Sequence, residues 1–152
     1  MQSVRILKID GKVFFNLQRI CTSKVLFFRS ILNRTNNFNN IIWRDCVTNN
    51  NFKQIVECPI LDKIIVNERH RYKVQGIFGG LLSQESEQQT RRWTSRIEGC
   101  VIKIPSAMVS DVCDLYIQCL QHIDSTFNIY DDEIVLSYMY NIHPELFHII
   151  NR

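Results

Sequence analysis

The sequence predicts an α+β fold in which a small sheet is flanked by helices. The chain opens with two short alternating segments around a tight turn, and helical periodicity follows them. In the last third, an apolar strand ending in proline precedes amphipathic helical segments. With 152 residues, of which 45% are hydrophobic and 22% charged, the chain is typical of one globular domain with its own core.

The opening segments predict a β-hairpin followed by two short helices. Residues 4–9 and 12–16 are the predicted strands, and Asp10-Gly11 between them suits a type I′ turn, which needs positive φ at both central positions. Helical spacing follows in two groups, the second capped by Ser23. The apolar positions of these groups are Leu17, Ile20 and Cys21, then Leu26, Phe27 and Ile31, with Ser30 at the same spacing.

The middle of the chain gives weaker signals. Residues 33–40 are polar and rich in Asn, which predicts a loop. Residues 62–66 and 71–78 resemble a second hairpin that turns around Asn67–His70. Gly79-Gly80 ends that hairpin, and the polar stretch 83–90 is predicted to be a loop.

The segment from 98 to 121 predicts a strand followed by a helix. Residues 98–105 form the strand, which Pro105 terminates, and Ser106 is expected to cap the helix. Asp111 and Asp114 lie in the early turns, where the helix dipole favours acidic side chains. One apolar stripe follows at helical spacing: Val109, Val112, Cys113, Tyr116, Ile117 and Leu120.

Two more helices are predicted at the end of the chain. Three acidic residues open the first helix, and Pro144 suits the first turn of the second. The acidic residues are Asp131, Asp132 and Glu133, and the buried face of that helix would be Ile134, Val135, Tyr138 and Met139. The final helix would bury Leu146, Phe147, Ile149 and Ile150.

Charge is distributed unevenly along the chain, although the net charge is only +3. Residues 1–34 carry seven Lys and Arg and one Asp, whereas residues 99–152 carry two basic and seven acidic residues. A nucleic-acid-binding module would usually be basic throughout, whereas this chain has a basic front and an acidic back. The abundance of Asn and Ile is typical of AT-rich genomes, many viral genomes among them.

The chain is expected to be intracellular, in the cytoplasm or nucleus, or in the virion if it is viral. No apolar run approaches the length of about 20 residues that a membrane span needs, and the charged N-terminus is unlike a signal peptide. No pair of the six cysteines has CxxC spacing, so we expect mostly buried free thiols, with a disulfide between two of them still open.

Catalytic and metal-binding chemistry have little support. Cys119 and His122 at i and i+3, with Asp124 nearby, suggest half of a zinc site, but zinc usually takes two close ligand pairs and no second pair is evident. None of His70, His122, His143 and His148 belongs to a known catalytic motif. We therefore expect no enzyme activity, no metal and no cofactor.

Two arginine-rich clusters suggest a possible contact with nucleic acid. Arginine beside an exposed aromatic ring can bind phosphate and stack on bases. Glu68, Glu85 and Glu87 interleave with these clusters, so a solvated loop face is the simpler interpretation. The candidate contacts are Arg69, Arg71, Lys73, Arg91, Arg92, Trp93 and Arg96.

Three stretches resemble the BTB/POZ fold, particularly its compact members, such as elongin C and related cullin adaptors and the tetramerisation domains of potassium channels. The first is VRILKIDGKVFFNLQRICTSKVLFFRSIL at 4–32, with Gly11, Phe14, Ser23, Phe28 and Arg29 at the matching positions. The others are VIKIPSAMVSDVCDLYIQCLQHIDS at 101–125 and FNIYDDEIVLSYMYNIHPELFHII at 127–150. The resemblance implies one domain over 1–152, with a core of 4–34 and 99–152 and a long insertion at 35–98.

The resemblance implies a non-enzymatic protein–protein interaction module. The leading hypothesis is an adaptor that links a cullin-type ubiquitin ligase to a recruited protein. The alternative is a self-assembling structural subunit, for example of a viral particle, because a basic front and an acidic back favour head-to-tail contacts. Nucleic-acid binding is a minor alternative. The expected partner-binding residues are Met108, Asp111, Val112, Tyr116, Asp131, Asp132, Glu133, Tyr138 and Phe147.

Overall fold

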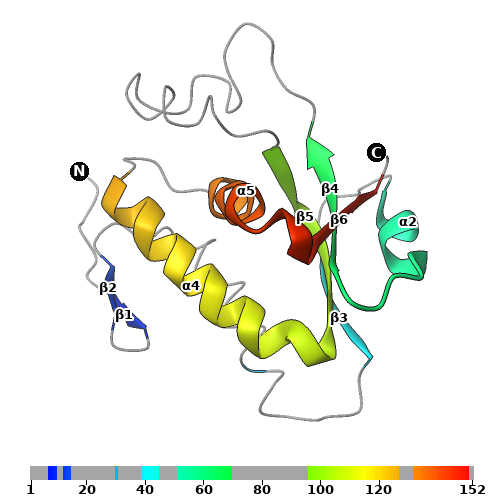
Figure 1. Ribbon diagram of the computed structural model, residues 1–152, viewed down its shortest axis with the longest axis horizontal. Helices are drawn as coiled ribbons and strands as arrows, with labels where there is room; N and C mark the ends of the chain where they lie inside the picture. The colour runs from blue at the N-terminus through cyan, green and yellow to red at the C-terminus, as the bar shows by residue number, and fades with distance from the viewer. Residues whose placement is uncertain are drawn as a thin grey trace, which may run out of the picture.

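The computed structural model confirms the α+β class and arranges the chain in layers (Figure 1). The structure describes residues 7–9, 12–14, 30, 39–44, 51–69, 96–126 and 132–150. A two-stranded hairpin lies at one end and helix α2 (Phe52–Glu57) at the other. Between them lie α4 (Val109–Thr126), α5 (Asp132–Ile142) and a four-stranded sheet of order β3-β5-β4-β6.

The predicted opening hairpin is confirmed. Strand β1 (Leu7–Ile9) pairs antiparallel with β2 (Lys12–Phe14), and the pairing of Ile9 with Lys12 leaves two residues for the turn. The hairpin lies beside α4 (Figure 1). Ser30 is helical as expected, and the rest of the two predicted helices at 17–32 lies outside the described residues.

The predicted strand at 98–105 is also confirmed and forms the centre of the sheet. Strand β5 (Arg96–Pro105) pairs antiparallel with β3 (Asn40–Arg44) along its C-terminal half. Its N-terminal half pairs with the end of β4 (Ile64–Arg69), and an irregular bulge separates the two halves. The stretch 35–98, predicted as an insertion, therefore supplies two strands of the main sheet.

The hairpin expected between 62–66 and 71–78 is wrong as a pairing scheme. Ile65 pairs with Lys103 of β5 on one side and with His148 on the other, so both edges of β4 are occupied there. Asn67–Arg69, expected as part of a turn, continue the strand instead. Residues 71–78 lie outside the described part of the chain.

The final predicted helix is wrong after its first turn. Pro144–Leu146 forms the short 3₁₀ helix η2, and Phe147–Ile150 forms strand β6, parallel to β4. Phe147 and Ile149 face the main core, whereas Ile150 joins a second cluster across the sheet. Alternation of buried faces with a period of two is the property of a strand, and it requires a neighbouring strand that local sequence does not reveal.

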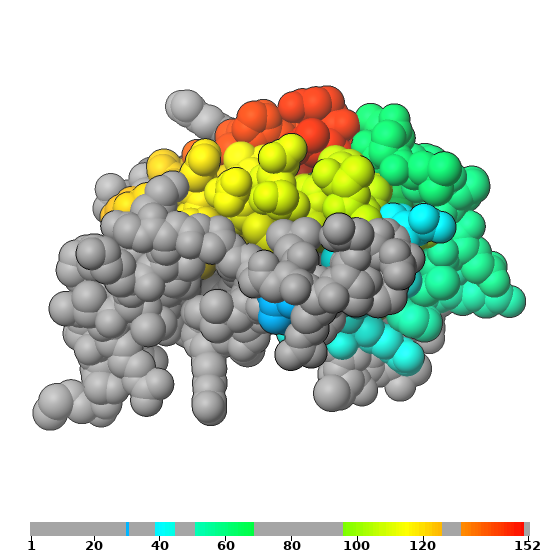
Figure 2. Space-filling model, turned by 90° about the horizontal axis from the view of Figure 1, so that it is seen from below, coloured from blue at the N-terminus to red at the C-terminus, as the bar shows by residue number. Residues whose placement is uncertain are grey.

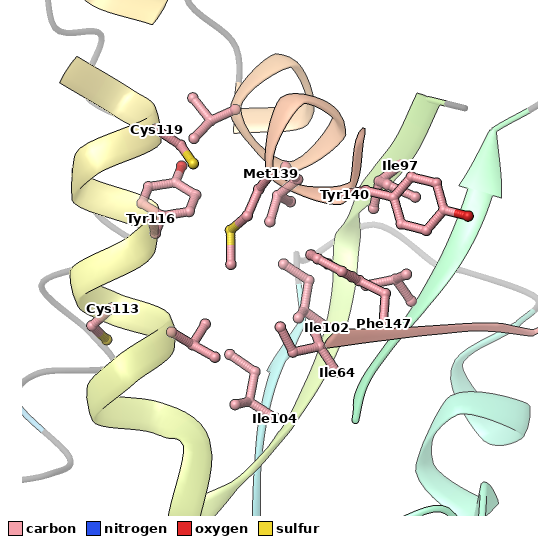
Figure 3. Close-up of a cluster of buried hydrophobic side chains, with 14 of the residues drawn as sticks. Ile64, Ile97, Ile102, Ile104, Cys113, Tyr116, Cys119, Met139, Tyr140 and Phe147 are labelled. Atoms are coloured by element: carbon pink, nitrogen blue, oxygen red, sulfur yellow. The ribbon is translucent and has the colours of Figure 1, made fainter. Parts of the chain in front are cut away.

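Helices α4 and α5 form one core with the sheet, as the apolar stripes predict. All six predicted stripe residues of α4 are buried, with Cys119 and Ile123 in addition. Met139 of α5 points into the space between Tyr116 of α4 and the strand residues (Figure 3). The entry to α4 differs from prediction, because Ser106 begins a 3₁₀ turn, η1 (Ser106–Met108), that precedes the α-helix.

A smaller cluster packs on the opposite face of the sheet, beneath α2. It contains Ile55, Ile65, Val101 and Ile150. Lys103 lies on this face and is buried; its Nζ donates to the carbonyl oxygens of Val56 (2.8 Å) and Cys58 (2.9 Å). Because a cation is favourable at a helix C-terminus, this lysine fixes the end of α2 to the sheet.

Candidate functional site

Most of the expected partner-binding residues belong to the interior. Asp111 is exposed, and Met108 and Tyr138 are half-buried at the edge of the core. Asp131 lies outside the described residues. The other five are buried, which removes them from any exposed surface: Val112, Tyr116, Asp132, Glu133 and Phe147.

The acidic start of α5 forms an internal contact rather than an exposed acidic surface. Glu133 Oε2 accepts hydrogen bonds from Arg96 Nη2 (2.8 Å) and Nε (2.9 Å), and both side chains are buried. Glu133 Oε1 accepts from the backbone N–H of Gly99 at 3.4 Å, and Ser137 Oγ accepts from that of Ile97 at 2.9 Å. Side chains of α5 thus bind the half of β5 that β3 does not reach.

This contact also changes the predicted nucleic-acid cluster. Arg96 is turned inward and paired with Glu133, so it does not present its guanidinium to phosphate. Arg69 is the last residue of β4. The remaining candidates lie outside the described residues: Arg71, Lys73, Arg91, Arg92 and Trp93.

Cys119 and His122, the two residues of α4 considered as half of a zinc site, do not converge. The Cys119 side chain faces the core, and burial raises the pKa of its thiol to about 12. The His122 ring is exposed and stacks on Tyr138 of α5, with centroids 4.6 Å apart. Within the described ranges, no group of three or more His, Cys, Asp and Glu is arranged to hold a metal ion.

A polar cluster that the sequence did not suggest lies at the bulge of β5. Glu98 accepts a hydrogen bond from Asn67 Nδ2 at 2.6 Å and another from Cys100 Sγ at 2.9 Å. The cluster therefore joins β4 to β5 through the hydrogen bond between Asn67 and Glu98.

Two large apolar side chains are exposed on segments that lie side by side. Leu61 is 72% exposed and Ile142 is 44% exposed. Lys63 Nζ donates to the backbone oxygen of Glu145 at 2.9 Å, which joins the two segments. We call Leu61, Lys63, Ile142 and Glu145 the corner surface. Sequence reasoning missed it, because a leucine before a strand and an isoleucine ending a helix are indistinguishable from core residues.

The corner surface contains side chains of both charges, Lys63 and Glu145. Glu145 Oε1 lies 3.2 Å from His143 Nδ1, and both side chains are largely exposed. The hydrogen bond from its own backbone amide is the main cause that lowers the pKa of Glu145, with smaller contributions from His143 and Lys63. The carboxylate therefore stays ionised across the neutral range and can meet a cationic group of a partner.

The outer edge of the sheet at β3 is a second surface feature. The backbone N–H of Ser106 donates to the oxygen of Asn39 at 3.0 Å, which makes these two residues a hydrogen-bonded pair of the β3–β5 ladder. Such pairs alternate along an antiparallel ladder. Ile41 and Trp43 therefore direct their backbone groups toward β5, whereas Asn40, Ile42 and Arg44 direct theirs to the outer edge.

In comparisons with known proteins, no family model, curated protein or solved structure matches this chain. Among the helices that the structure describes, none is long and apolar enough to cross a membrane.

Proposed function

We propose that this chain is a non-enzymatic protein–protein interaction module that uses the corner surface for contact with a partner. The observation that carries the proposal is the exposure of Leu61 and Ile142 on segments joined by the Lys63–Glu145 hydrogen bond. Protein interfaces combine apolar side chains with charged groups at their rim, and the corner surface contains side chains of both kinds.

Several ionisable side chains form internal contacts between elements of the fold, which supports a binding role over catalysis. Glu133 is paired with Arg96, Lys103 is bound by two carbonyl oxygens, and Glu98 holds Asn67. These groups connect one element to another. Buried polar groups engaged in this way stabilise a fold and make it specific, whereas a catalytic centre needs groups aimed at a site where substrate can bind.

A finer proposal is the adaptor role that the resemblance to compact BTB/POZ proteins implies. In that role the chain would link a cullin-type ubiquitin ligase to a recruited protein. Among the described members of the expected contact set, Met108, Asp111 and Tyr138 are exposed or half-buried. The adaptor role predicts that a purified cullin binds this chain directly and that Asp111→Arg weakens the complex.

The corner surface is tested by site-specific photo-crosslinking in cell extract, with the crosslinker at position 61 or, as a matched control, at the exposed Gln118 of α4. We expect discrete crosslinked partners from position 61 that disappear when Ile142→Asp is added. Purified partner should then bind the native chain and lose affinity for Leu61→Asp. Equal crosslinking from both positions would contradict the assignment of the surface.

A further inference from the structure

Strand β3 lies at the end of the described sheet, and three of its residues direct their backbone groups away from that sheet. Strand β5 is its described neighbour in the sheet, and β3 is the terminal strand of the order β3-β5-β4-β6. The backbone groups of Asn40, Ile42 and Arg44 point away from β5. The terminal strand of a sheet can pair with a further strand unless a charge, proline or bulge blocks it.

The side chains of β3 offer little such protection. The sequence of the strand is NIIWR, and its single charged residue, Arg44, lies at the end. Ile42 and Trp43 are half-buried, and β3 forms a regular ladder with β5 over all five residues. Atoms of β3 reach the molecular surface in the view from below (Figure 2).

One polar atom of β3 lacks a partner. The side-chain oxygen Oδ1 of Asn40 is buried and accepts no hydrogen bond. Native proteins pair nearly all buried polar atoms, so this acceptor calls for a donor that none of the described residues supplies in this structure. Arg44 is an exposed donor on the same face of β3, where its guanidinium lies 4.2 Å from the ring centroid of Phe52.

We propose that β3 pairs antiparallel with β3 of a second copy of this chain, which joins the two sheets across a two-fold axis at Ile42. The outward residues then match in register: Ile42 faces Ile42 of the second copy, and Asn40 faces Arg44 of the second copy. Each pair exchanges two backbone hydrogen bonds. Cross-strand neighbours lie within side-chain contact, so a rotamer change at Asn40 brings its oxygen to the guanidinium opposite.

The register is the reason for choosing a second copy over a different protein. The same strand supplies both the unpaired acceptor at Asn40 and the donor at Arg44, at equal spacing from Ile42. An isologous contact requires this self-complementarity. The contact joins a neutral amide to a cation, so it should respond weakly to salt. Head-to-tail assembly through the basic and acidic ends of the chain would instead be strongly salt-dependent.

The test is sedimentation velocity of the intact chain over about a hundredfold range of concentration around 10 μM, at low and high salt. We expect a monomer–dimer equilibrium that salt changes little. Ile42→Pro removes an N–H that points outward, which an edge strand tolerates, so this variant should be monomeric and folded, with only the modest loss of stability that comes from removing the Ile42 contacts with the second cluster. Ile41→Pro is the matched control, because it removes an N–H that points to β5 and should destabilise the monomer.

A second variant keeps the test decisive if Ile42→Pro does not fold. Arg44→Leu removes the guanidinium donor opposite the Asn40 oxygen, and the loss occurs twice in a two-fold dimer. We expect its dissociation constant to rise by at least about tenfold. A native chain that is monomeric at every concentration would overturn the proposal, as would a dimer unaffected by both variants or one that dissociates in salt. Leu61→Asp should leave the dimer intact, so failure here is separate from failure of the corner surface.

Discussion

The buried ion pair between Arg96 and Glu133 gives the sharpest test of how α5 is attached to the sheet. Glu133→Leu removes a carboxylate that accepts two hydrogen bonds from Arg96 and one from the backbone of Gly99. The substitution leaves the buried guanidinium without this carboxylate. The leucine itself is tolerable on a helix, so the loss comes from burying the guanidinium without this carboxylate.

The expected magnitude follows from the burial of both partners. Breaking a buried ion pair by removing one member costs about 3–5 kcal/mol. For a chain of this length, that loss corresponds to a decrease in the thermal unfolding midpoint of about 6–20 °C. Arg96→Met should cost less than Glu133→Leu, because the methionine leaves a carboxylate that still accepts from Gly99.

The decisive measurement is a double-mutant cycle by urea denaturation at pH 7. We expect Arg96→Met/Glu133→Leu to be more stable than Glu133→Leu alone, because the double variant contains neither charge. Glu145→Gln, which changes an exposed carboxylate paired with His143, is the matched control and should alter stability little.

An additive cycle would refute this reasoning. If the double variant lost as much free energy of unfolding as the two single variants combined, the two side chains would not be coupled. A loss below about 1 kcal/mol for Glu133→Leu would place the pair among ordinary surface ion pairs and contradict its burial.

Three further predictions concern other parts of the structure. Lys103→Met should lower stability by about 1.5–3 kcal/mol and speed hydrogen exchange in α2 more than in β5, because it removes charge-assisted bonds to the end of that helix. Iodoacetamide, followed by mass mapping, should modify the half-buried Cys58 well before the buried Cys119 in the native state, whereas urea should abolish the difference. Stability should fall as the pH rises from about 9 toward 12, because burial raises the pKa of Cys119 and the folded state retains a proton that the unfolded state releases. Alkaline urea titration should show a smaller decrease for Cys119→Ala; an equal decrease would contradict this origin.

The candidate surfaces could be predicted from the sequence less well than the fold. The stripe of α4 was predictable because burial follows helical periodicity, but Val112 and Tyr116 could be read as core or as contact residues equally well. Leu61 and Ile142 carry no pattern that marks them as exposed. Their exposure depends on how the chain entering β4 meets the end of α5, a contact between residues 82 positions apart.

The sequence by itself determined the hairpin around Asp10-Gly11, strand β5 and helices α4 and α5, because turn chemistry and apolar periodicity act over a few residues. The tertiary structure alone decided that Phe147–Ile150 is a strand, since a parallel strand exists only beside its neighbour, β4. It also decided that Glu133 is buried rather than exposed, because the arginine that neutralises it lies 37 residues away. Local patterns specify elements, whereas long-range pairing of strands and charges decides which residues remain at the surface.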